Sequence, residues 1–331
     1  MKKIINNPKN VVSETLKGLT LAKEDLVYVP EAEVVYCSHT SEKVGLVSGG
    51  GSGHEPAHAG YVGYGLLDAA VAGNIFSSPG PDRILEGIRR ANHGKGVLLV
   101  IKNYSGDIMN FDMAKDLAEM EGIFVDSVVV RDDVAVEEST YSTGRRGVAG
   151  TVFVHKIAGA KAREGAPLEE VKRCAQKAID ATRTMGMAMS ACTIPEVGRP
   201  NFVLGDDEME IGMGIHGEPG VQRSGILSAK ELAERLLSHI FQDRDYRGKR
   251  VALLVNGLGA TPLMELYILH AEVCEILKNE GITVVKHMVG NYMTALDMAG
   301  ASVSLMEVDE ELERLLLAPC DSLQWKETLQ Q

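Results

Sequence analysis

The sequence predicts an α/β protein built from two α/β domains. Apolar runs of strand length alternate with helical patterns along the chain, and turn residues separate them. The length of 331 residues corresponds to about two domains. A stretch rich in Met, Gly and Pro at residues 185–200 marks a change in composition. We therefore expect an N-terminal domain over residues 1–185 with a mainly parallel, three-layer sheet, and a smaller mixed-sheet domain over residues 186–331.

The first half of the chain carries the pattern of a parallel sheet. Its strands are separated by long helices, which is the connection that parallel neighbours need. Ligands bind such sheets beyond the carboxyl ends of the strands. The predicted strands cover residues 44–48, 66–72, 96–102 and 123–130, and the predicted helices cover residues 81–92, 106–121, 148–163 and 168–185.

The second half continues the alternation. Ser228 stands three residues before Glu231, which is the spacing of a capping box at a helix start. The predicted order is a strand at 208–213, helix at 228–240, strand at 250–256, helix at 262–279, strand at 283–289, and then a late strand and helix.

Composition and charge narrow the classes of function. The net charge of −12 and the pI of about 5.3 argue against a nucleic-acid partner. They do not argue against a phosphorylated ligand, because a local site can be positive in an acidic protein. The five cysteines are odd in number and form no CxxC pair, which is typical of reduced thiols. Residues 1–10 are polar and lack the apolar run that is typical of a signal peptide, and no stretch of the sequence approaches about 18 uninterrupted apolar residues. We expect a cytoplasmic protein with no membrane segment.

The most informative segment is VSGGGSGHEP at residues 47–56. A strand runs into a loop almost without side chains, where backbone N–H groups can approach a ligand, and the loop delivers His54 to the same place. We expect a helix to open at Pro56. His54 and His58 also fit the HExxH string of zinc proteases, but Pro56 disfavours a helix that contains His54. We therefore expect no metal here.

A second segment, GMGIHGEPG at residues 212–220, echoes the first. Glycines leave the ring of His216 open to small molecules. Imidazole is a competent nucleophile toward a carbonyl group, and its adduct stops at a hemiaminal. A turn histidine that hydrogen-bonds to the backbone explains the same spacing, and this segment alone does not decide between the two.

The segment KNYSGD at residues 102–107 places Lys102 at a strand end and Asp107 at a helix start. Asp107 either accepts a proton from a hydroxyl group during phosphorylation or only stabilises the helix N-terminus. Arg145 and Arg146 form either an anion clamp or ordinary ion pairs with acids. The turn at residues 256–262 either shapes a site or is only a tight connection.

Together these segments resemble the K subunits of the dihydroxyacetone kinase family over nearly the whole chain. The strings that carry the resemblance are SGGGSGHEPAHAGYVG (48–63), LLDAAVAG (66–73), KNYSGD (102–107), TGRRGVAGTVFVHKIAGA (143–160), EMEIGMGIHGEPG (208–220) and NGLGATP (256–262).

The resemblance implies a set of roles. His216 would bind the carbonyl carbon of dihydroxyacetone as a covalent hemiaminal, which admits short ketones and aldehydes and refuses glycerol. His54 and Asp107 would do acid/base work on the hydroxyl group. The remaining matched positions, implied to contact the substrate, are Gly51, Ser52, Gly53 and Lys102.

The resemblance also implies partners. A chain that stops at Gln331 resembles a separate K subunit that binds no cofactor itself. An L subunit would hold ADP or ATP with Mg²⁺, and a phosphocarrier M subunit of the phosphoenolpyruvate-dependent phosphotransferase system would recharge it. A homodimer is also implied. Two alternatives stay open: a dihydroxyacetone-sensing paralogue that acts as coactivator of a transcription regulator, and a kinase subunit for a related ketose or aldehyde.

Overall fold

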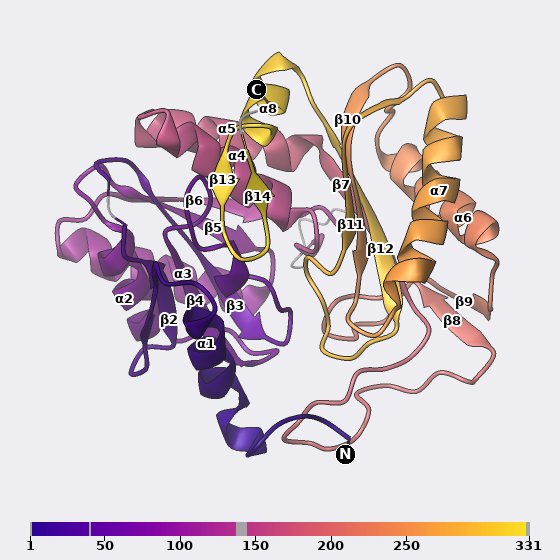
Figure 1. Cartoon of the computed structure of the whole chain (residues 1–331), viewed down its shortest axis with the longest axis horizontal. Coiled ribbons are helices and arrows are strands. Elements are labelled where there is room, and N and C mark those ends of the chain that lie inside the picture. Colours follow the sequence, from indigo (N-terminus) through magenta and orange to yellow (C-terminus); the bar gives the residue numbers. More distant parts are fainter. Residues whose placement is uncertain (1, 40, 137–143, 329–331) are drawn as a thin grey trace.

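The computed structural model describes residues 2–39, 41–136 and 144–328. In this part of the chain, two six-stranded sheets are accompanied by a two-stranded ribbon. Figure 1 shows the N-terminal half in indigo to magenta on one side and the C-terminal half in orange to yellow on the other. The C-terminal segment returns to lie against the N-terminal half.

The first sheet has the order β1-β2-β4-β3-β5-β6. β3, β4, β5 and β6 pair in parallel, whereas β1 and β2 form an antiparallel edge. The prediction of a mainly parallel sheet is therefore confirmed. Its strands are β1 (Leu26–Val29), β2 (Val34–Cys37), β3 (Gly45–Ser52), β4 (Ala69–Ile75), β5 (Val97–Lys102) and β6 (Val125–Val130).

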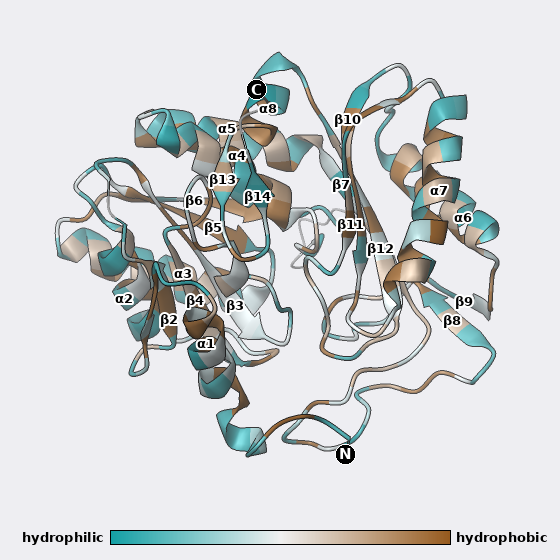
Figure 2. Cartoon of the chain, viewed as in Figure 1, coloured by the Kyte–Doolittle hydropathy of each residue, from teal (hydrophilic) through white to brown (hydrophobic). Residues whose placement is uncertain are grey.

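Helices cover both faces of this sheet and make three layers. Along β5, Leu98 and Val100 face one apolar core, and Leu99 and Ile101 face another. A strand buried on both faces is continuously apolar, which is why its sequence shows no alternation. One face carries α2 (Pro81–Ala91) and α3 (Ser105–Met120), and the other carries α4 (Thr151–Arg163) and α5 (Leu168–Ala181). In Figure 2 the apolar colouring gathers on strands such as β5, and the hydrophilic colouring on the outer sides of helices such as α2.

The second sheet is mixed and has the order β11-β10-β12-β7-β8-β9. Only β10 and β11 run in parallel. One face packs on α6 and α7, while residues of the other face, such as Leu254 and Met306, join the core of the first sheet. Its elements are β7 (Thr182–Ala188), β8 (Glu208–Ile211), β9 (Gln222–Gly225), α6 (Ala229–Asp243), β10 (Arg250–Gly257), α7 (Leu263–Asn279), β11 (Thr283–Gly290) and β12 (Gly300–Glu307).

Some predicted elements have other bounds in the structure. The strand expected at 66–72 lies at Ala69–Ile75, because Leu66 and Leu67 are buried from a turn that precedes it. The helix expected to run to residue 185 ends at Ala181, where the chain enters β7 and pairs with β12. The predicted domain boundary at 185/186 therefore falls inside a strand.

The helix expected at Pro56 is absent. Residues 53–58 form turns, followed by the 3₁₀ helix Ala59–Tyr61. The carbonyl groups of Gly53 and His54 accept from the backbone N–H groups of Leu296 and Thr294, at 2.7 and 3.2 Å. These long-range bonds fasten the loop to the second half of the chain.

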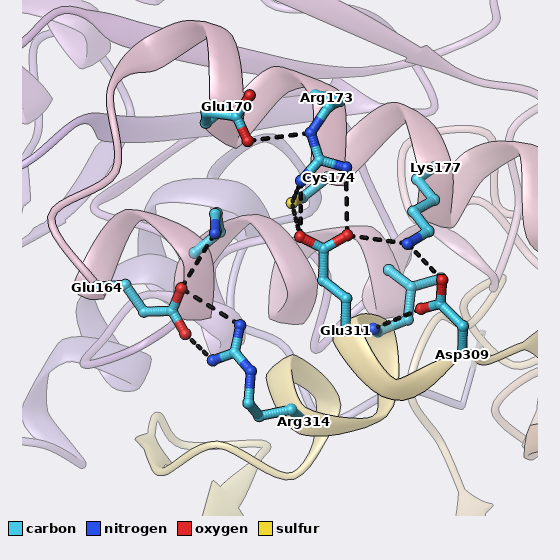
Figure 3. Close-up of polar contacts among 10 residues, drawn as sticks. Glu164, Glu170, Arg173, Cys174, Lys177, Asp309, Glu311 and Arg314 are labelled. Carbon is cyan, nitrogen blue, oxygen red and sulfur yellow. Dashed lines mark hydrogen bonds and ion pairs between the residues drawn. The ribbon is translucent and has the colours of Figure 1, made fainter.

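The short helix α8 (Glu310–Leu316) joins the C-terminal segment to the N-terminal half (Figure 3). Glu311 accepts hydrogen bonds from Arg173 at 2.6 Å and Lys177 at 2.8 Å, both on α5. Hydrogen bonds from Arg173 and then from Lys177 lower the pKa of Glu311 to about 2. Single exposed ion pairs stabilise little, but this shared network fixes α8 on α5.

Four further elements complete the described chain: the 3₁₀ helix Pro8–Asn10, α1 (Val11–Leu21), β13 (Cys320–Asp321) and β14 (Lys326–Glu327). Over the described residues, no helix is both long enough and apolar enough to cross a membrane.

Candidate active site

The candidate site lies where the loop after β3 meets loops of the second half. His54 follows β3 directly and is fully buried. Its Nδ1 lies 2.7 Å from the carbonyl oxygen of Thr294, which can only accept, so Nδ1 carries the proton. The Nε2 atom of His54 is therefore left with its lone pair toward the site.

Asn256 holds the loop that carries Thr294. It is the first residue of the NGLGATP segment and lies at the end of β10, and its side chain donates to the carbonyl group of Met293 at 2.7 Å. It also accepts from the backbone N–H groups of Tyr292 and Met293 at 2.8 and 2.9 Å. This segment therefore shapes the site, which was one of the two interpretations that the sequence allowed.

His216 enters the site from the loop after β8. Its Nδ1 lies 2.8 Å from Oε1 of Glu218, and its backbone N–H donates to Oε2 of the same carboxylate at 2.9 Å. Asn201 donates to the carbonyl oxygen of His216 at 2.9 Å. Because Glu218 holds Nδ1 of the ring and Asn201 holds the backbone of His216, the ring presents Nε2 to the site. Its side chain keeps 21% of its surface exposed, so solvent and small molecules reach it.

Gly214 makes room for this arrangement. A Cβ atom at this position would lie 2.1 Å from Oε2 of Glu218 and 2.5 Å from Nη1 of Arg146. Neither contact is possible, so any side chain here would displace the carboxylate. From the sequence, Gly214 was expected to leave the ring of His216 accessible. In the structure it leaves room for the carboxylate of Glu218, which holds that ring.

The two histidines meet at the centre of the site. Their Nε2 atoms lie 3.0 Å apart. Phe76 stacks on His54 with ring centroids 5.1 Å apart and meets His216 edge-on at 5.3 Å. Tyr104 also meets His216 edge-on, with ring centroids 4.6 Å apart. These rings restrict the orientation of the His216 ring in the site.

Burial and charge set the protonation of this pair. Burial, with the nearby positive charge of Lys102, holds the pKa of His54 well below its usual value. Burial works to raise the pKa of Glu218, but the hydrogen bond and charge of His216 overcome it and lower that pKa to about 2. His54 is neutral and Glu218 is ionised near pH 7.

Lys102 and Asp107 converge on the glycine loop. A methyl group on Gly50 would lie 3.4 Å from Oδ2 of Asp107 and 3.4 Å from Nζ of Lys102. Asp107 accepts a hydrogen bond from Ser78. Burial raises the pKa of Asp107, and the charge of Lys102 opposes that rise. The buried Nζ of Lys102 has no hydrogen-bond partner among the described residues.

The predicted glycine loop approaches another chain segment very closely. A Cβ atom on Gly51 would lie 2.5 Å from the backbone nitrogen of Ser77, and one on Gly53 would lie 2.9 Å from the ring of Phe76. The hydroxyl group of Ser52 donates to the carbonyl oxygen of Gly73 at 2.7 Å. The bare backbone thus admits the segment after β4, which brings Phe76 and Ser78 into the site.

The contacts of two other sequence features, the HExxH string and the arginine pair, decide between the interpretations given for them. His54 faces His216 while His58 faces His155, with Nδ1 and Nε2 3.0 Å apart, so the HExxH string does not form one helical face. Arg145 pairs with Asp243, and Arg146 pairs with Asp133 at 2.7 Å. The arginines therefore make ion pairs, and Arg146 also stands beside Glu218.

The sequence analysis assigned no role to Glu218, Phe76, Ser78 or Tyr104. Glu218 was visible as an acid two residues after His216. Phe76 and Ser78 follow the carboxyl end of β4, where a parallel sheet binds its ligands, but the predicted strand ended three residues too early. Tyr104 lies within KNYSGD, and nothing in the sequence shows its contact with His216.

Comparisons with known proteins show the family to which the chain belongs. The Dak1 domain matches residues 17–324. The dihydroxyacetone-binding subunit DhaK of a PTS-dependent dihydroxyacetone kinase from Listeria innocua is 53% identical, over 98% of this chain and 100% of the relative. The DhaKLM operon coactivator DhaQ of Lactococcus lactis is 40% identical, over 98% and 100%.

Among solved structures, the dihydroxyacetone kinase of C. freundii superimposes with a TM-score of 0.89 at 32% identity, covering 98% of this chain and 60% of that chain. The matched segment spans both sheets and every residue of the site described above. This chain belongs to the Dak1 domain family.

Proposed function

We propose that this chain is the dihydroxyacetone-binding subunit of a phosphoenolpyruvate-dependent dihydroxyacetone kinase. The observation that carries the proposal is the orientation of His216. Its Nδ1 is anchored on Glu218 and its Nε2 points into a site that a small molecule can reach. An imidazole held in this way is a positioned nucleophile rather than a turn histidine. The family of the chain adds the substrate, a short ketone.

The proposed covalent step is balanced in atoms and in charge. Nε2 of His216 gives its lone pair to the carbonyl carbon, and the π pair of the carbonyl bond moves to oxygen, which takes one proton from solvent. The product is a hemiaminal on a ring that keeps its Nδ1 proton and is cationic. Glu218, ionised 2.8 Å from Nδ1, neutralises that charge. An alcohol such as glycerol offers no carbon for this bond and is refused.

Asp107 and His54 then serve the terminal hydroxyl group. As the hydroxyl oxygen bonds to the transferred phosphoryl group, its proton must leave, and Asp107 is the buried carboxylate placed to take it. His54, neutral with a free Nε2, is the second acceptor at the site. Burial lowers the pKa of Lys102, and the charges of Asp107 and Glu218 oppose that fall; in its ammonium form Lys102 offers positive charge to the phosphoryl oxygens.

The donor nucleotide and Mg²⁺ belong to the partner L subunit in this proposal. Mg²⁺ is bound through carboxylates and phosphates. At this site Glu218 is committed to His216, and Asp107 lies beside the ammonium group of Lys102. The described residues of the site therefore do not fit a magnesium ion, and this chain binds no cofactor of its own.

A partner surface begins at the site itself. Helix α3 starts beside Asp107 and exposes Met109, Met113, Leu117 and Met120 along one face, at fractions between 40% and 84%. An exposed apolar stripe of this kind supports contact with another protein. We assign it to the L subunit, with the M phosphocarrier acting only through L. The proposal also includes a homodimer of this chain.

The test combines binding and turnover. Native mass spectrometry of the chain with dihydroxyacetone should show one covalent adduct, and His216→Ala should remove it. With the L and M subunits and phosphoenolpyruvate, the wild-type chain should form dihydroxyacetone phosphate, whereas Asp107→Asn should keep the adduct and lose turnover. An unchanged adduct in His216→Ala would refute the covalent role.

The same experiments distinguish the coactivator function from the kinase function. A relative of that kind is 40% identical over the full chain, so the ability to bind the ketone does not decide between the two functions. The presence of both His54 and Asp107 favours the kinase. If the adduct forms but no pairing of L and M subunits gives product, the coactivator function replaces the proposal. Comparing kcat/KM for dihydroxyacetone with that for other short ketoses decides the substrate range.

A further inference from the structure

A second cluster of ligand-type side chains lies at the junction of α7 and β11. His270 and Cys274 stand four residues apart on α7, so both lie on one face of the helix. His287 reaches them from β11, an edge strand of the second sheet. Of the described residues, these three form the one group of three or more His, Cys, Asp or Glu side chains close enough to share a metal ion.

A β-bulge turns His287 toward the helix. Val251 pairs with Val284, but the next residue of β10, Ala252, pairs with Lys286, so β11 carries one extra residue. Val284 packs on the α6 and α7 side before the bulge. Simple alternation would then place position 287 on the opposite face, and the bulge reverses this.

The partner of His287 in the register is Leu253, whose side chain lies in the core beneath α7. Lys286 points the other way and pairs with Glu327 of β14. The strand therefore presents the imidazole to Cys274 and the ammonium group to the other face.

The spacing of the ligand atoms matches a tetrahedral ion. Nε2 of His270 lies 3.0 Å from Nδ1 of His287, and Sγ of Cys274 lies 3.4 Å from the first and 3.8 Å from the second. Zinc–nitrogen bonds of about 2.0–2.1 Å and zinc–sulfur bonds of about 2.3 Å at tetrahedral angles give edges of about 3.3–3.6 Å. The three measured edges straddle that range, so small side-chain rotations suffice.

We propose that His270, Cys274 and His287 bind a zinc ion, with solvent in the fourth position. One thiolate and two imidazoles form a borderline-to-soft donor set that suits Zn²⁺ and disfavours Mg²⁺ or Ca²⁺, which take oxygen ligands. His287 is exposed while His270 and Cys274 are half-buried, so the ion has an entry path and an open coordination position.

This site is separate from the one that holds His216. Helix α7 packs on the face of the second sheet that it shares with α6, whereas Met293 and Met288 face the first sheet. In Figure 1, α7 lies on the outer side of the second sheet, away from the N-terminal half. The ion would clamp α7 to an edge strand that has a neighbour on one side only. The predicted effect is on stability, with no step of the kinase reaction involved.

The test is a cobalt and zinc titration of the full-length, tag-free chain after treatment with a chelator. Co²⁺ should bind at one equivalent and give the absorption of a tetrahedral site together with a thiolate-to-cobalt charge-transfer band. Zn²⁺ should displace it. Zn²⁺ should also raise the melting temperature, since an ion that binds only the folded state stabilises it.

Matched variants decide the assignment. Cys274→Ser should abolish the charge-transfer band and weaken zinc binding by more than the roughly 10–100-fold caused by loss of an outer-shell partner. His287→Gln, at an exposed position, should also lose the site without harming the fold. The controls Cys192→Ser and His39→Gln should bind as wild type. Equal binding by Cys274→Ser, or no tetrahedral cobalt spectrum in wild type, would overturn the proposal.

Discussion

The Nε2 atoms of His54 and His216 face each other at 3.0 Å while each Nδ1 is already committed to an acceptor. Two neutral rings in this arrangement would point lone pairs at each other. Burial, with the charge of Lys102, holds the pKa of His54 well below its usual value, so the ring of His54 stays neutral. In the proposed function the lone pair on Nε2 of His216 forms the bond to the ketone carbon, which removes it from this contact.

Glu218→Gln tests whether the carboxylate holds the imidazolium. The amide keeps the shape but loses the charge that neutralises the ring after attack. We expect kcat/KM of the assembled kinase to fall at least about 100-fold, as is typical when a group orienting a catalytic imidazole is lost, and the adduct to weaken in native mass spectra. Glu234→Gln on α6 is the control, since this side chain is exposed. A variant with wild-type kcat/KM would exclude the role.

Lys102→Met tests the electrostatic coupling to Asp107. Burial raises the pKa of Asp107, and the ammonium group of Lys102 is the first influence that lowers it again. Without that charge the pKa of Asp107 rises further, so the carboxylate protonates at a higher pH. The acid limb of the plot of kcat/KM against pH should therefore move to higher pH. A limb that stays in place or moves down contradicts the coupling.

Two substitutions of glycine by alanine should have different effects, one on adduct formation and the other on stability. Gly214→Ala would place a methyl group 2.1 Å from Oε2 of Glu218, so it should displace the carboxylate and abolish adduct formation. Gly18→Ala lies inside α1, where an added Cβ meets nothing within 4 Å. It should stabilise the protein by about 0.5–1 kcal/mol, because alanine favours helix more than glycine. Chemical denaturation and native mass spectrometry measure the two outcomes.

Buried histidines predict a loss of stability in acid. Burial lowers the pKa of His155 to about 3, whereas an unfolded histidine titrates near about 6.5. Between these values the unfolded state binds more protons, so the free energy of unfolding falls as pH falls, by at most about 1.4 kcal/mol per pH unit for each such group. Below the lower value the loss is complete, and above the higher value it is absent.

His155→Gln isolates this effect. The free energy of unfolding of this variant should depend less steeply on pH than that of the wild type between about pH 6 and 4, a range that lies between the unfolded and folded pKa values of His155. Urea unfolding at several pH values measures this slope. His39→Gln should keep the wild-type slope, since this residue is exposed. Equal slopes in His155→Gln and wild type would show that another group governs acid sensitivity.

Much of the candidate site was visible in the sequence because it is local. Lys102 ends β5, His54 and Asp107 come after the carboxyl ends of β3 and β5 in the parallel sheet, and His216 lies in the loop after β8 of the second sheet. The mainly parallel first sheet followed from the alternation of strands and helices. The missing helix at Pro56 and the shift of β4 arose where distant segments decide the backbone: the hydroxyl group of Thr294 donates to the carbonyl group of Glu55, and β4 pairs with β2 and β3.

The sequence by itself determined the α/β class, the positions of the main helices and the polar residues that gather at the strand ends, since these depend on periodicity and local turns. Only the tertiary structure decided that Phe76 and Tyr104 enclose His216, that Asn256 holds the loop facing His54, and that a bulge turns His287 toward Cys274. The reason is that such contacts join residues far apart in the chain, and their geometry is fixed by packing and register rather than by sequence spacing.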